Sequence, residues 1–445
     1  MTISRRSFLG TTAAAAAVAS GAATRSAALG ANEKVGVCCV GVHGQGRNHI
    51  AEFTKYEASE VVALCDVDRK VLEERGAQLA EKTGKKPKLY ADMREAFEDK
   101  SIDAVSIATP NHWHTLATIW ACQAGKDVYV EKPLAHSFWE GQQLVKAAEK
   151  HQRIVQHGTQ QRSDPTCRRD MKLLHEGTLI GPVVHARGYV YKNGNRMAIG
   201  RGKAGTPPEH LDYNLWLGPA GERPWMDRVG GDPNLDEGGG LFVPYNWHWF
   251  WDFGNGECGN QGVHEMDVAV WAANKGLPVR VASNGGRYAW KDDGQTPNTQ
   301  ASQFTYADGT LLTFEVRNLG SFNEACDSNC SNSAFGTDGY WVREKGFFDY
   351  QNKPIPIPES AALPHSDGPF GNFINAVKSR KMEDVHGTPE EGFRSCAHIH
   401  LANIAYRLQQ SLDFDPEQGT FAQGEKANRM LKDAYREPFV VPEIS

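Results

Sequence analysis

A glycine-rich turn near the start of the chain has the composition of a phosphate-binding loop. It reads "VGVHGQGRNH" (residues 40–49), follows an apolar run, and has its glycines at Gly41, Gly44 and Gly46. Such a turn lets backbone N–H groups approach a pyrophosphate at the start of a helix. The usual fingerprint has a glycine where this chain has His43. Because histidine is enriched among non-glycine residues at positive φ, we expect a left-handed His43 to be tolerated.

A carboxylate lies where a bound dinucleotide would need one. Asp66 comes 20 residues after Gly46, near the end of the next apolar run, Val61–Val67. A carboxylate there accepts hydrogen bonds from the adenosine ribose hydroxyls and repels a 2′-phosphate. The pattern therefore favours NAD over NADP. A helix N-cap is the alternative for Asp66, although Asp68 already suits that purpose.

Alternating strands and helices must hold these residues in place. Apolar runs predict strands within residues 34–42, 61–67, 102–109, 127–133 and 153–159. Helical patterns separate them, and one begins after Asp68 and stops at Gly84. Alternation of this kind predicts βαβ units with a parallel sheet, which we assign to residues 32–156.

The pattern changes after about residue 156. Residues 183–191 alternate, and residues 303–316 hold two alternating runs around Asp308-Gly309, which is a strong hairpin signal. Residues 157–445 are therefore predicted to form an α+β domain with a large, mainly antiparallel sheet. Residues 193–257 have no sustained period, and their Trp and Tyr content favours a binding loop over disorder. "FINAVKSR" and "RSCAHIHLANIAYRLQQ" predict two amphipathic helices.

The first residues have the features of an export signal rather than of a folded element. "SRRSFLG" (Ser4–Gly10) is followed by an alanine-rich run and resembles a twin-arginine signal peptide, which we assign to residues 1–31. A short amphipathic helix or a chance Arg-Arg pair is the alternative. The resemblance implies export of a folded protein by the twin-arginine machinery, and hence a periplasmic or other extracytoplasmic location.

Composition excludes several classes of protein. The 445 residues carry a formal net charge of −6, and no basic run concentrates positive charge as a nucleic-acid binder requires. No later run is long and apolar enough to span a bilayer. His112 and His114 have no third ligand nearby in the sequence, and His264 lacks the second histidine of a zincin motif, so no metal site is predicted.

Five motifs in order identify a family resemblance. "GVHGQG", "CDVD", "IDAVSIATPNHWH", "AGKDVYVEKPLA" and "GNQGVHEMD" together resemble the glucose–fructose oxidoreductase, inositol dehydrogenase and rhizopine-catabolism family (Gfo/Idh/MocA). The likeness runs from about Lys34 to the C-terminus. It implies an N-terminal Rossmann domain, a C-terminal domain with a large antiparallel sheet, and NAD(P)-dependent hydride transfer at a sugar or polyol hydroxyl. It also implies a homo-oligomer formed through the sheet.

The resemblance implies roles for individual residues. The lysine of its "EKP" motif, here Lys132, lies beside the nicotinamide, where an ammonium can polarise a carbonyl or stabilise an alkoxide. His264 matches the histidine that exchanges the hydroxyl proton. Asn260 stands where many sugar dehydrogenases of the family have Asp, and an amide cannot take a proton. A surface lysine and a structural histidine are the alternatives. The turns after the third and fourth strands supply the other expected cofactor contacts: Thr109, Asn111, His114 and Glu131.

Substrate contacts are expected from aromatic and charged residues. "PYNWHWFWDF" precedes the His264 segment, and we expect one or two of Tyr245, Trp247 and Trp249 to stack on a sugar ring, with the others in the core. Arg162 is a candidate clamp for a polar substrate group, with a surface salt bridge as the alternative. Asp267 is a further candidate for substrate contact.

Three functions remain open on the sequence. The first is a carbohydrate oxidoreductase with tightly held NAD. The second is a redox-neutral glycoside-cleaving enzyme, similar to NAD-dependent α-N-acetylgalactosaminidases, whose pattern lacks the EKP lysine. The third is a non-catalytic sugar binder. An exported enzyme must retain its cofactor: dissociation near 10⁻⁴ s⁻¹ with association near 10⁶ M⁻¹s⁻¹ requires a Kd of about 10⁻¹⁰ M, or about −13.6 kcal/mol.

Overall fold

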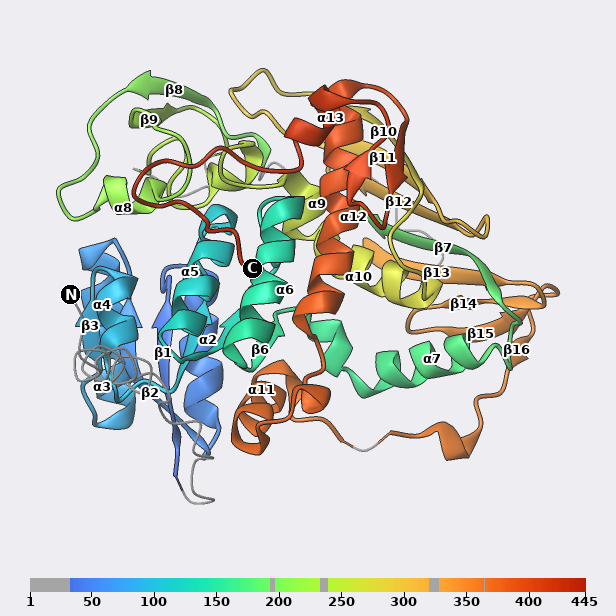
Figure 1. Ribbon diagram of the computed structural model, residues 1–445, viewed down its shortest axis with the longest axis horizontal. Helices are drawn as coiled ribbons and strands as arrows, with labels where there is room; N and C mark the ends of the chain where they lie inside the picture. Colours follow the sequence, from blue (N-terminus) through green and yellow to red (C-terminus); the bar gives the residue numbers. More distant parts are fainter. Residues whose placement is uncertain (1–32, 193–196, 233–238, 320–327, 364) are drawn as a thin grey trace, which may run out of the picture.

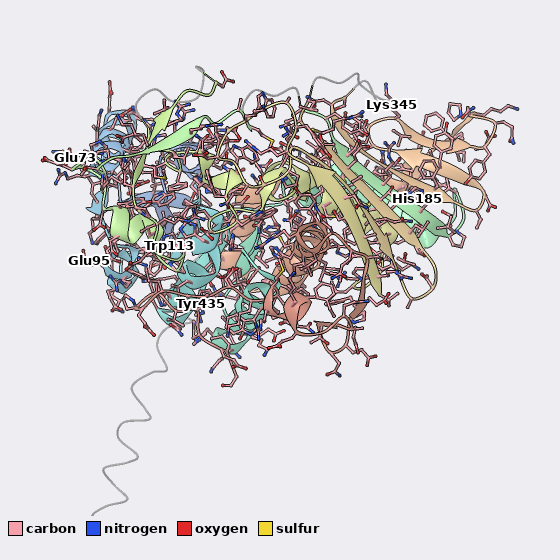
Figure 2. The ribbon with its side chains drawn as sticks, turned by 90° about the horizontal axis from the view of Figure 1, so that it is seen from above. Glu73, Glu95, Trp113, His185, Lys345 and Tyr435 are labelled. Atoms are coloured by element: carbon pink, nitrogen blue, oxygen red, sulfur yellow. The ribbon has the colours of Figure 1, made fainter. Side chains whose placement is uncertain are left out.

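The computed structural model describes residues 33–192, 197–232, 239–319, 328–363 and 365–445. The predicted signal peptide, residues 1–31, lies outside the described residues. Two sheets with their covering helices lie side by side in Figure 1. In the perpendicular view of Figure 2, Glu73 and Glu95 mark the N-terminal domain, and His185 and Lys345 mark the far part of the large sheet.

The first sheet is parallel and has six strands in the order β3-β2-β1-β4-β5-β6. This is the doubly wound order of a Rossmann domain, as predicted. Strands β1, β4, β5 and β6 are buried at every residue, which explains the continuous apolar runs, whereas the edge strand β3 is largely exposed. The strands are β1 (Val35–Val40), β2 (Ser59–Cys65), β3 (Lys88–Tyr90), β4 (Ala104–Ile107), β5 (Asp127–Val130) and β6 (Val155–His157).

Local capping fixes the helices between these strands. The Asp68 side chain accepts a hydrogen bond from the Val71 N–H, and Gly84 ends the same helix at a φ of 73°, so both predicted boundaries are confirmed. Strand β3 and helix α4 were not predicted, because each is too short to show a period. The helices of this domain are α2 (Gln45–Lys55), α3 (Arg69–Thr83), α4 (Met93–Glu98), α5 (Asn111–Gln123) and α6 (Phe138–His151).

The second sheet has ten strands, in the order β16-β15-β14-β13-β7-β12-β11-β10-β17-β18. The predicted hairpin joins β11 to β12, and Gly309 takes the left-handed turn position at a φ of 86°. Strands β7 and β12 pair in parallel and the other neighbours are antiparallel, so the predicted mainly antiparallel sheet is confirmed. The strands are β7 (Val183–Val190), β10 (Arg280–Gly286), β11 (Thr299–Thr305), β12 (Leu311–Arg317), β13 (Cys330–Gly336), β14 (Gly339–Val342), β15 (Gly346–Asp349), β16 (Pro354–Ile355), β17 (Leu412–Asp415) and β18 (Thr420–Phe421).

Helix α12 (Pro389–Leu408) was predicted to be amphipathic, and that prediction is wrong. It is buried on nearly every side over residues 395–405, because it packs between α6, α10 and β10. Helix α12 contacts α6 and β6 of the first domain and α10 and β10 of the second. It therefore joins the two domains along most of its length (Figure 1). Other helices and turns of this half are α7 (Pro165–Glu176), α9 (Gly256–Asn260), α10 (Gly262–Ala273), α13 (Glu425–Arg429), and the 3-10 turns η1 (Gln160–Ser163), η3 (Asn246–Trp249), η4 (Glu359–Ala361) and η5 (Met382–Asp384).

Segments distant in sequence return to the N-terminal domain. Helix α11 (Gly368–Ser379) puts Phe370 and Phe373 against Phe53 and Tyr129 of the parallel-sheet core. The aperiodic stretch 193–257 contains β8 (Arg201–Ala204), α8 (Tyr213–Leu217) and β9 (Met226–Val229), while residues 193–196 and 233–238 of it lie outside the described residues. None of the helices in the described part of the chain is long and apolar enough to cross a membrane.

Candidate functional site

A long cavity runs along the carboxyl edge of the parallel sheet. Its volume is about 750 Å³, and its walls come from both domains. Doubly wound folds bind ligands at this edge. The site residues predicted from the sequence that line it are Gly41, His43, Gly44, Asp66, Thr109, Asn111, His114, Glu131, Lys132, Tyr245, Trp247 and Asn260.

The glycine loop closes the cavity beside β1. Gly41 takes the left-handed conformation, at a φ of 78°. His43 is not among the residues at positive φ, so the expectation of a left-handed His43 is wrong. A side-chain carbon on Gly46 would lie 1.7 Å from the Gly41 carbonyl oxygen, whereas Gly44 faces open space. Glycine is therefore required at 41 and 46 by packing, and the place of His43 tolerates a side chain.

Asp66 lies on the cavity wall and is held by the loop. Its two carboxylate oxygens accept hydrogen bonds from the Val42 N–H, at 2.7 Å, and from the Asp68 N–H, at 2.9 Å. Burial raises the pKa of Asp66, and these backbone donors oppose that rise. The alternative role of helix N-cap belongs to Asp68 instead. Asp66 is thus free of the capping role and faces the cavity.

The walls fit a dinucleotide. Among the described residues, the buried Thr109 hydroxyl oxygen and the Arg75 Nε have no hydrogen-bond partner, and both residues line the cavity. Helix α2 begins at Gln45 without a side-chain cap; the Arg47 N–H donates to the Gly44 oxygen, and Gln45 at the start of the helix lines the cavity. Unpartnered donors beside an open helix N-terminus suit pyrophosphate and ribose oxygens.

Lys132 meets Asn260 at one end of the cavity. The Lys132 Nζ donates a hydrogen bond to the Asn260 main-chain oxygen over 3.1 Å. The Asn260 side-chain Nδ2 donates to the Tyr245 hydroxyl, also over 3.1 Å. All three residues line the cavity, and they come from the end of β5, the end of α9 and the loop before η3. An ammonium, an amide and a phenol therefore converge on one place.

His264 lies next to this group but is only half-buried and is not among the residues lining the cavity. It is in the first turn of α10, and its main-chain N–H donates to the Gln261 oxygen. Burial, followed by the charge of Lys132, lowers the pKa of His264 to about 3, although Glu131 opposes both effects. The imidazole is therefore neutral at neutral pH and has a lone pair that can accept a proton.

Glu131 is held from behind by a buried chain of hydrogen bonds. One of its oxygens contacts His49 Nε2, at 3.0 Å, and Gln45 Nε2, at 3.2 Å, and the other accepts from the Lys132 N–H, at 3.0 Å. His49 Nδ1 contacts the Ser106 hydroxyl at 2.6 Å. Although burial would raise the pKa of Glu131, the hydrogen bond from His49 and nearby positive charges hold it below its usual range. Sequence reasoning missed His49, whose only signal was its place three residues after Gly46.

Asn111 and His114 join the turns after β4 and β5. The His114 ring nitrogens contact the Pro133 carbonyl oxygen, at 2.6 Å, and the Thr109 carbonyl oxygen, at 2.9 Å. Burial lowers the pKa of His114. The Asn111 amide donates to Asn255 of the second domain over 3.1 Å. Both residues line the cavity and also fix its walls.

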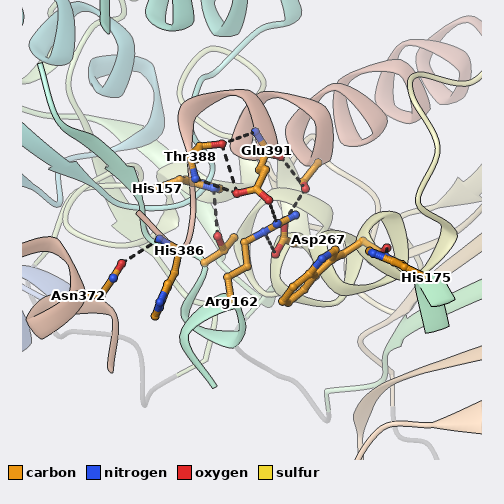
Figure 3. A network of polar contacts seen from close by, with 11 residues as sticks. His157, Arg162, His175, Asp267, Asn372, His386, Thr388 and Glu391 are labelled. Atoms are coloured by element: carbon orange, nitrogen blue, oxygen red, sulfur yellow. Dashed lines mark hydrogen bonds and ion pairs between the residues drawn. The ribbon is translucent and has the colours of Figure 1, made fainter. Parts of the chain in front are cut away.

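Arg162 and Asp267 lie elsewhere. The Arg162 Nε donates to both carboxylate oxygens of Asp267, at 3.0 and 2.9 Å, and its Nη1 donates to Glu391 (Figure 3). Its guanidinium also lies 4.7 Å from the centre of the Trp271 ring. Arg162 and Asp267 are 3% and 0% exposed and line no part of the cavity. The structure therefore places them in a buried ionic network and not with the predicted substrate contacts.

The three aromatic candidates divide between the cavity and the core. Trp247 lines the cavity and stacks on His248 at 3.6 Å between ring centres, and Tyr245 lines it too. Trp249 is fully buried in the core of the second domain. His248 also lines the cavity, and sequence reasoning missed it because aromatic neighbours gave it a core-like context.

Comparison with known proteins agrees with this geometry. Residues 34–159 match the oxidoreductase family with an NAD-binding Rossmann fold, and residues 169–441 match the C-terminal alpha/beta domain of that family. The solved WlbA dehydrogenase from Bordetella pertussis, in complex with NADH and UDP-GlcNAcA, is similar with a TM-score of 0.63 and 16% identity, over 86% of this chain and 99% of that one.

Two curated proteins are similar over a shorter stretch. Glycosyl hydrolase family 109 protein 1 from Shewanella sp. (strain ANA-3) is 32% identical over 177 residues, or 34% of this chain and 38% of that protein. The alpha-N-acetylgalactosaminidase from Shewanella oneidensis is 31% identical over the same shares. The chain thus matches well under half the length of these relatives, whereas the two family domains together cover most of the chain. The protein belongs to the Gfo/Idh/MocA oxidoreductase family and has its NAD-binding Rossmann domain.

Proposed function

We propose that this protein is an NAD-dependent oxidoreductase that acts on a hydroxyl group of a sugar or polyol and keeps its cofactor bound. One observation carries the proposal. Lys132 and Asn260 meet in the same cavity as the glycine loop and Asp66. A dinucleotide held by the loop and Asp66 would extend along this cavity toward Lys132. Bound NAD⁺ would supply the hydride acceptor.

Lys132 provides positive charge where an alkoxide develops. Its Nζ is held by the main-chain oxygen of Asn260, so the ammonium is oriented before the substrate arrives. A preoriented charge in a site that excludes water stabilises the developing oxyanion without reorganisation. Glu131 supports this from behind, because it accepts the Lys132 N–H and is itself fixed by His49.

His264 is the proposed acceptor of the hydroxyl proton. Its pKa, lowered to about 3 by burial and then by Lys132, keeps it neutral and able to accept. Asn260 cannot share that proton, but its amide donates a hydrogen bond that orients the Tyr245 hydroxyl. Lys132, His264 and Asn260 therefore act as electrostatic stabiliser, base and orienting group, with Tyr245, Trp247 and His248 as the surface for a sugar ring.

The location and assembly of the protein follow as further parts of this proposal. We infer export by the twin-arginine route from the sequence of residues 4–23, and a homo-oligomer from family resemblance. A protein that works outside the cytoplasm has no nucleotide pool to refill it. Its NAD must stay bound and be reset in place, by a second sugar or ketone or within one reaction cycle.

Redox-neutral cleavage of a glycoside is the second candidate. The similarity to family 109 glycosyl hydrolases favours it. In such a reaction, oxidation at C3 acidifies C2–H, loss of that proton expels the aglycone from C1, water adds to C1, and the ketone is reduced again. The electrons return to the sugar, so no net redox occurs. Retention of Lys132 favours simple oxidation over this route, and Lys132 with His264 favours either over a sugar binder without activity.

One titration separates these functions. The purified, NAD⁺-loaded protein is mixed with free sugars, polyols and aryl glycosides, and nicotinamide absorbance and aglycone release are followed together. An oxidoreductase gives one bound NADH per site and then stalls. Continuous aglycone release without lasting NADH supports glycoside cleavage. Binding of sugar with neither signal supports the binder.

A further inference from the structure

A segment of the second domain lies across the nucleotide end of the cavity. Residues 208–217, named here the roof segment, include helix α8 and follow β8 in the sequence, yet they pack on the turn between β2 and α3. The Arg69 N–H donates to the His210 oxygen over 2.8 Å, and the Asp212 N–H donates to the Val67 oxygen over 3.0 Å. Asp68 and Leu211 form an isolated antiparallel bridge. Figure 1 shows α8 beside the N-terminal domain rather than beside β7.

Side chains add to this pairing. His210 Nδ1 contacts the Asp68 carboxylate at 3.0 Å. Asp68 in turn donates its N–H to Asp66, the carboxylate predicted to bind the ribose. The roof segment is thus linked through Asp68 to the ribose-binding position. Asp68 also caps α3, so the same turn holds the roof and starts the helix.

The other end of the roof segment is anchored on α5 and on the C-terminal tail. The Trp113 indole N–H donates to the Leu215 and Trp216 oxygens, at 3.1 and 3.2 Å, and His112 Nε2 contacts the Trp216 oxygen at 3.0 Å. Arg436 donates to the Asn214 side chain, at 2.6 Å, to the Asn214 main-chain oxygen, at 2.8 Å, and to the Gly218 oxygen, at 3.2 Å. A side-chain carbon on Gly218 would lie 2.2 Å from the Trp113 ring, so this contact is close.

Three roof side chains form cavity wall. Leu211, Leu215 and Trp216 line the same cavity as the glycine loop, Asp66 and Lys132. The roof therefore covers the volume assigned to the dinucleotide, and it is fixed at both ends by contacts from outside its own domain. A bound dinucleotide could leave past the roof only after some of these contacts had broken.

We propose that the roof segment retains the dinucleotide: it slows dissociation of NAD(H) by closing the cavity over Asp66, with His210 and Arg436 as its latches. This inference rests on the proposed function only in taking NAD(H) as the occupant. A resident cofactor must dissociate slowly, and we assign that property to His210 and Arg436. Both are positioning residues, because they act by holding the roof segment in place.

The test measures dissociation of NADH without turnover. Full-length protein is loaded with NADH and diluted into excess NAD⁺, and the loss of bound-nicotinamide fluorescence is followed. We expect Arg436→Ala to raise the dissociation rate about tenfold or more, since it removes three hydrogen bonds, each worth about 0.5–1.5 kcal/mol. His210→Ala, which removes one contact to Asp68, should raise it about threefold. The double variant should combine both effects, since the latches share no partner.

Matched controls remove similar contacts away from the roof. Arg429→Ala removes an exposed ion pair with Glu425. His175→Ala removes a hydrogen bond (2.7 Å) from α7 to the Trp271 oxygen of α10, away from the roof segment. Both should dissociate NADH as wild type does. If His210→Ala and Arg436→Ala also match wild type while wild type binds NADH tightly, the roof proposal is overturned and the proposed function stands. If wild type binds no NADH, both are overturned.

Discussion

Two groups of charged side chains lie near the carboxyl edge of the first sheet, and they differ in what they face. Lys132 reaches the cavity and donates to an uncharged main-chain oxygen, with an amide and a phenol beside it. Arg162 lies outside the cavity, between two carboxylates and an aromatic ring (Figure 3). From the sequence, Lys132 was predicted to be a catalytic cation and Arg162 a substrate-binding one.

The difference distinguishes a group placed to act on a ligand from a group that holds the structure together. A buried cation that is paired with carboxylates has its charge balanced within the protein, and removing one partner leaves an uncompensated charge. Asp267 lies on α10 three residues after His264, so the Arg162 network fixes the helix that carries the proposed base. The Lys132 group faces open volume and can act on a ligand, whereas the Arg162 group sets the position of α10.

Removing the Lys132 charge should have the largest effect. Lys132→Met is expected to slow hydride transfer about 10³-fold, because oriented charge and proton-transfer groups contribute about 10²–10⁴-fold. Binding of NADH should change less than about threefold. Stopped-flow absorbance on NAD⁺-loaded protein measures the step. Lys88→Met, which removes an exposed ion pair with Asp99, is the control. Hydride transfer by Lys132→Met at the wild-type rate would contradict the role given to this lysine.

Removing the Arg162 charge should affect stability more than chemistry. Arg162→Met leaves Asp267 buried without its partner, and we expect a loss of about 3 kcal/mol in the free energy of unfolding. Denaturant titration measures it. Arg162→Met combined with Asp267→Leu should recover part of the loss, since no unpaired charge remains on α10. If the Arg162→Met protein has wild-type stability but no longer binds sugar, this account is contradicted and Arg162 belongs to the substrate site.

Replacing Asn260 with Asp should shift a pH profile. His264 acts in its neutral form and its pKa is about 3, so the rate governed by His264 stays level as pH falls until it approaches that value. A carboxylate at 260 favours the protonated imidazole and raises its pKa by about one to three units. The acid limb for Asn260→Asp should therefore lie at higher pH than in wild type. Rates are measured from pH 4 upward, with Asn246→Asp as a control. An Asn260→Asp profile that stays as level as the wild-type profile down to pH 4 would contradict this.

His43 should have the smallest effect. It lines the cavity but has ordinary φ, and the packing constraint lies at Gly41 and Gly46. His43→Gly should change NADH dissociation by less than about threefold, since no backbone strain is relieved. The chase experiment used for the roof variants measures it. A tenfold change in either direction would mean that the His43 ring contacts the dinucleotide.

The sequence predicted the first domain better than the second. The apolar runs that end near Gly41 and Asp66 and the helical pattern after Asp68 are local signals. In the structure, the two strands end and the helix begins at the places that these signals predict. The assignment of Arg162 to substrate could not be corrected from sequence, because its partners Asp267 and Glu391 are more than 100 residues away. The uniform burial of α12 and the docking of α11 and the roof on the first domain also depend on distant contacts.

The site could be predicted only in part for the same reason. Lys132, Asp66 and the glycine loop stand at strand ends, where topology alone brings them to one edge. The contact between Lys132 and Asn260 joins two domains, and so does the contact between Asn111 and Asn255. His49 and His248 have no distinctive spacing, and only the folded cavity identifies them.

We propose that a resident dinucleotide in this cavity takes hydride from a sugar or polyol at Lys132 and His264. The most direct test loads the protein with NAD⁺, removes free nucleotide, and adds a panel of sugars, polyols and aryl glycosides while bound NADH is followed by absorbance. We expect one NADH per chain with at least one free sugar or polyol, no further turnover, and loss of the signal in Lys132→Met. Loaded protein that forms no NADH with any of them, or that releases aglycone continuously without accumulating NADH, would contradict it.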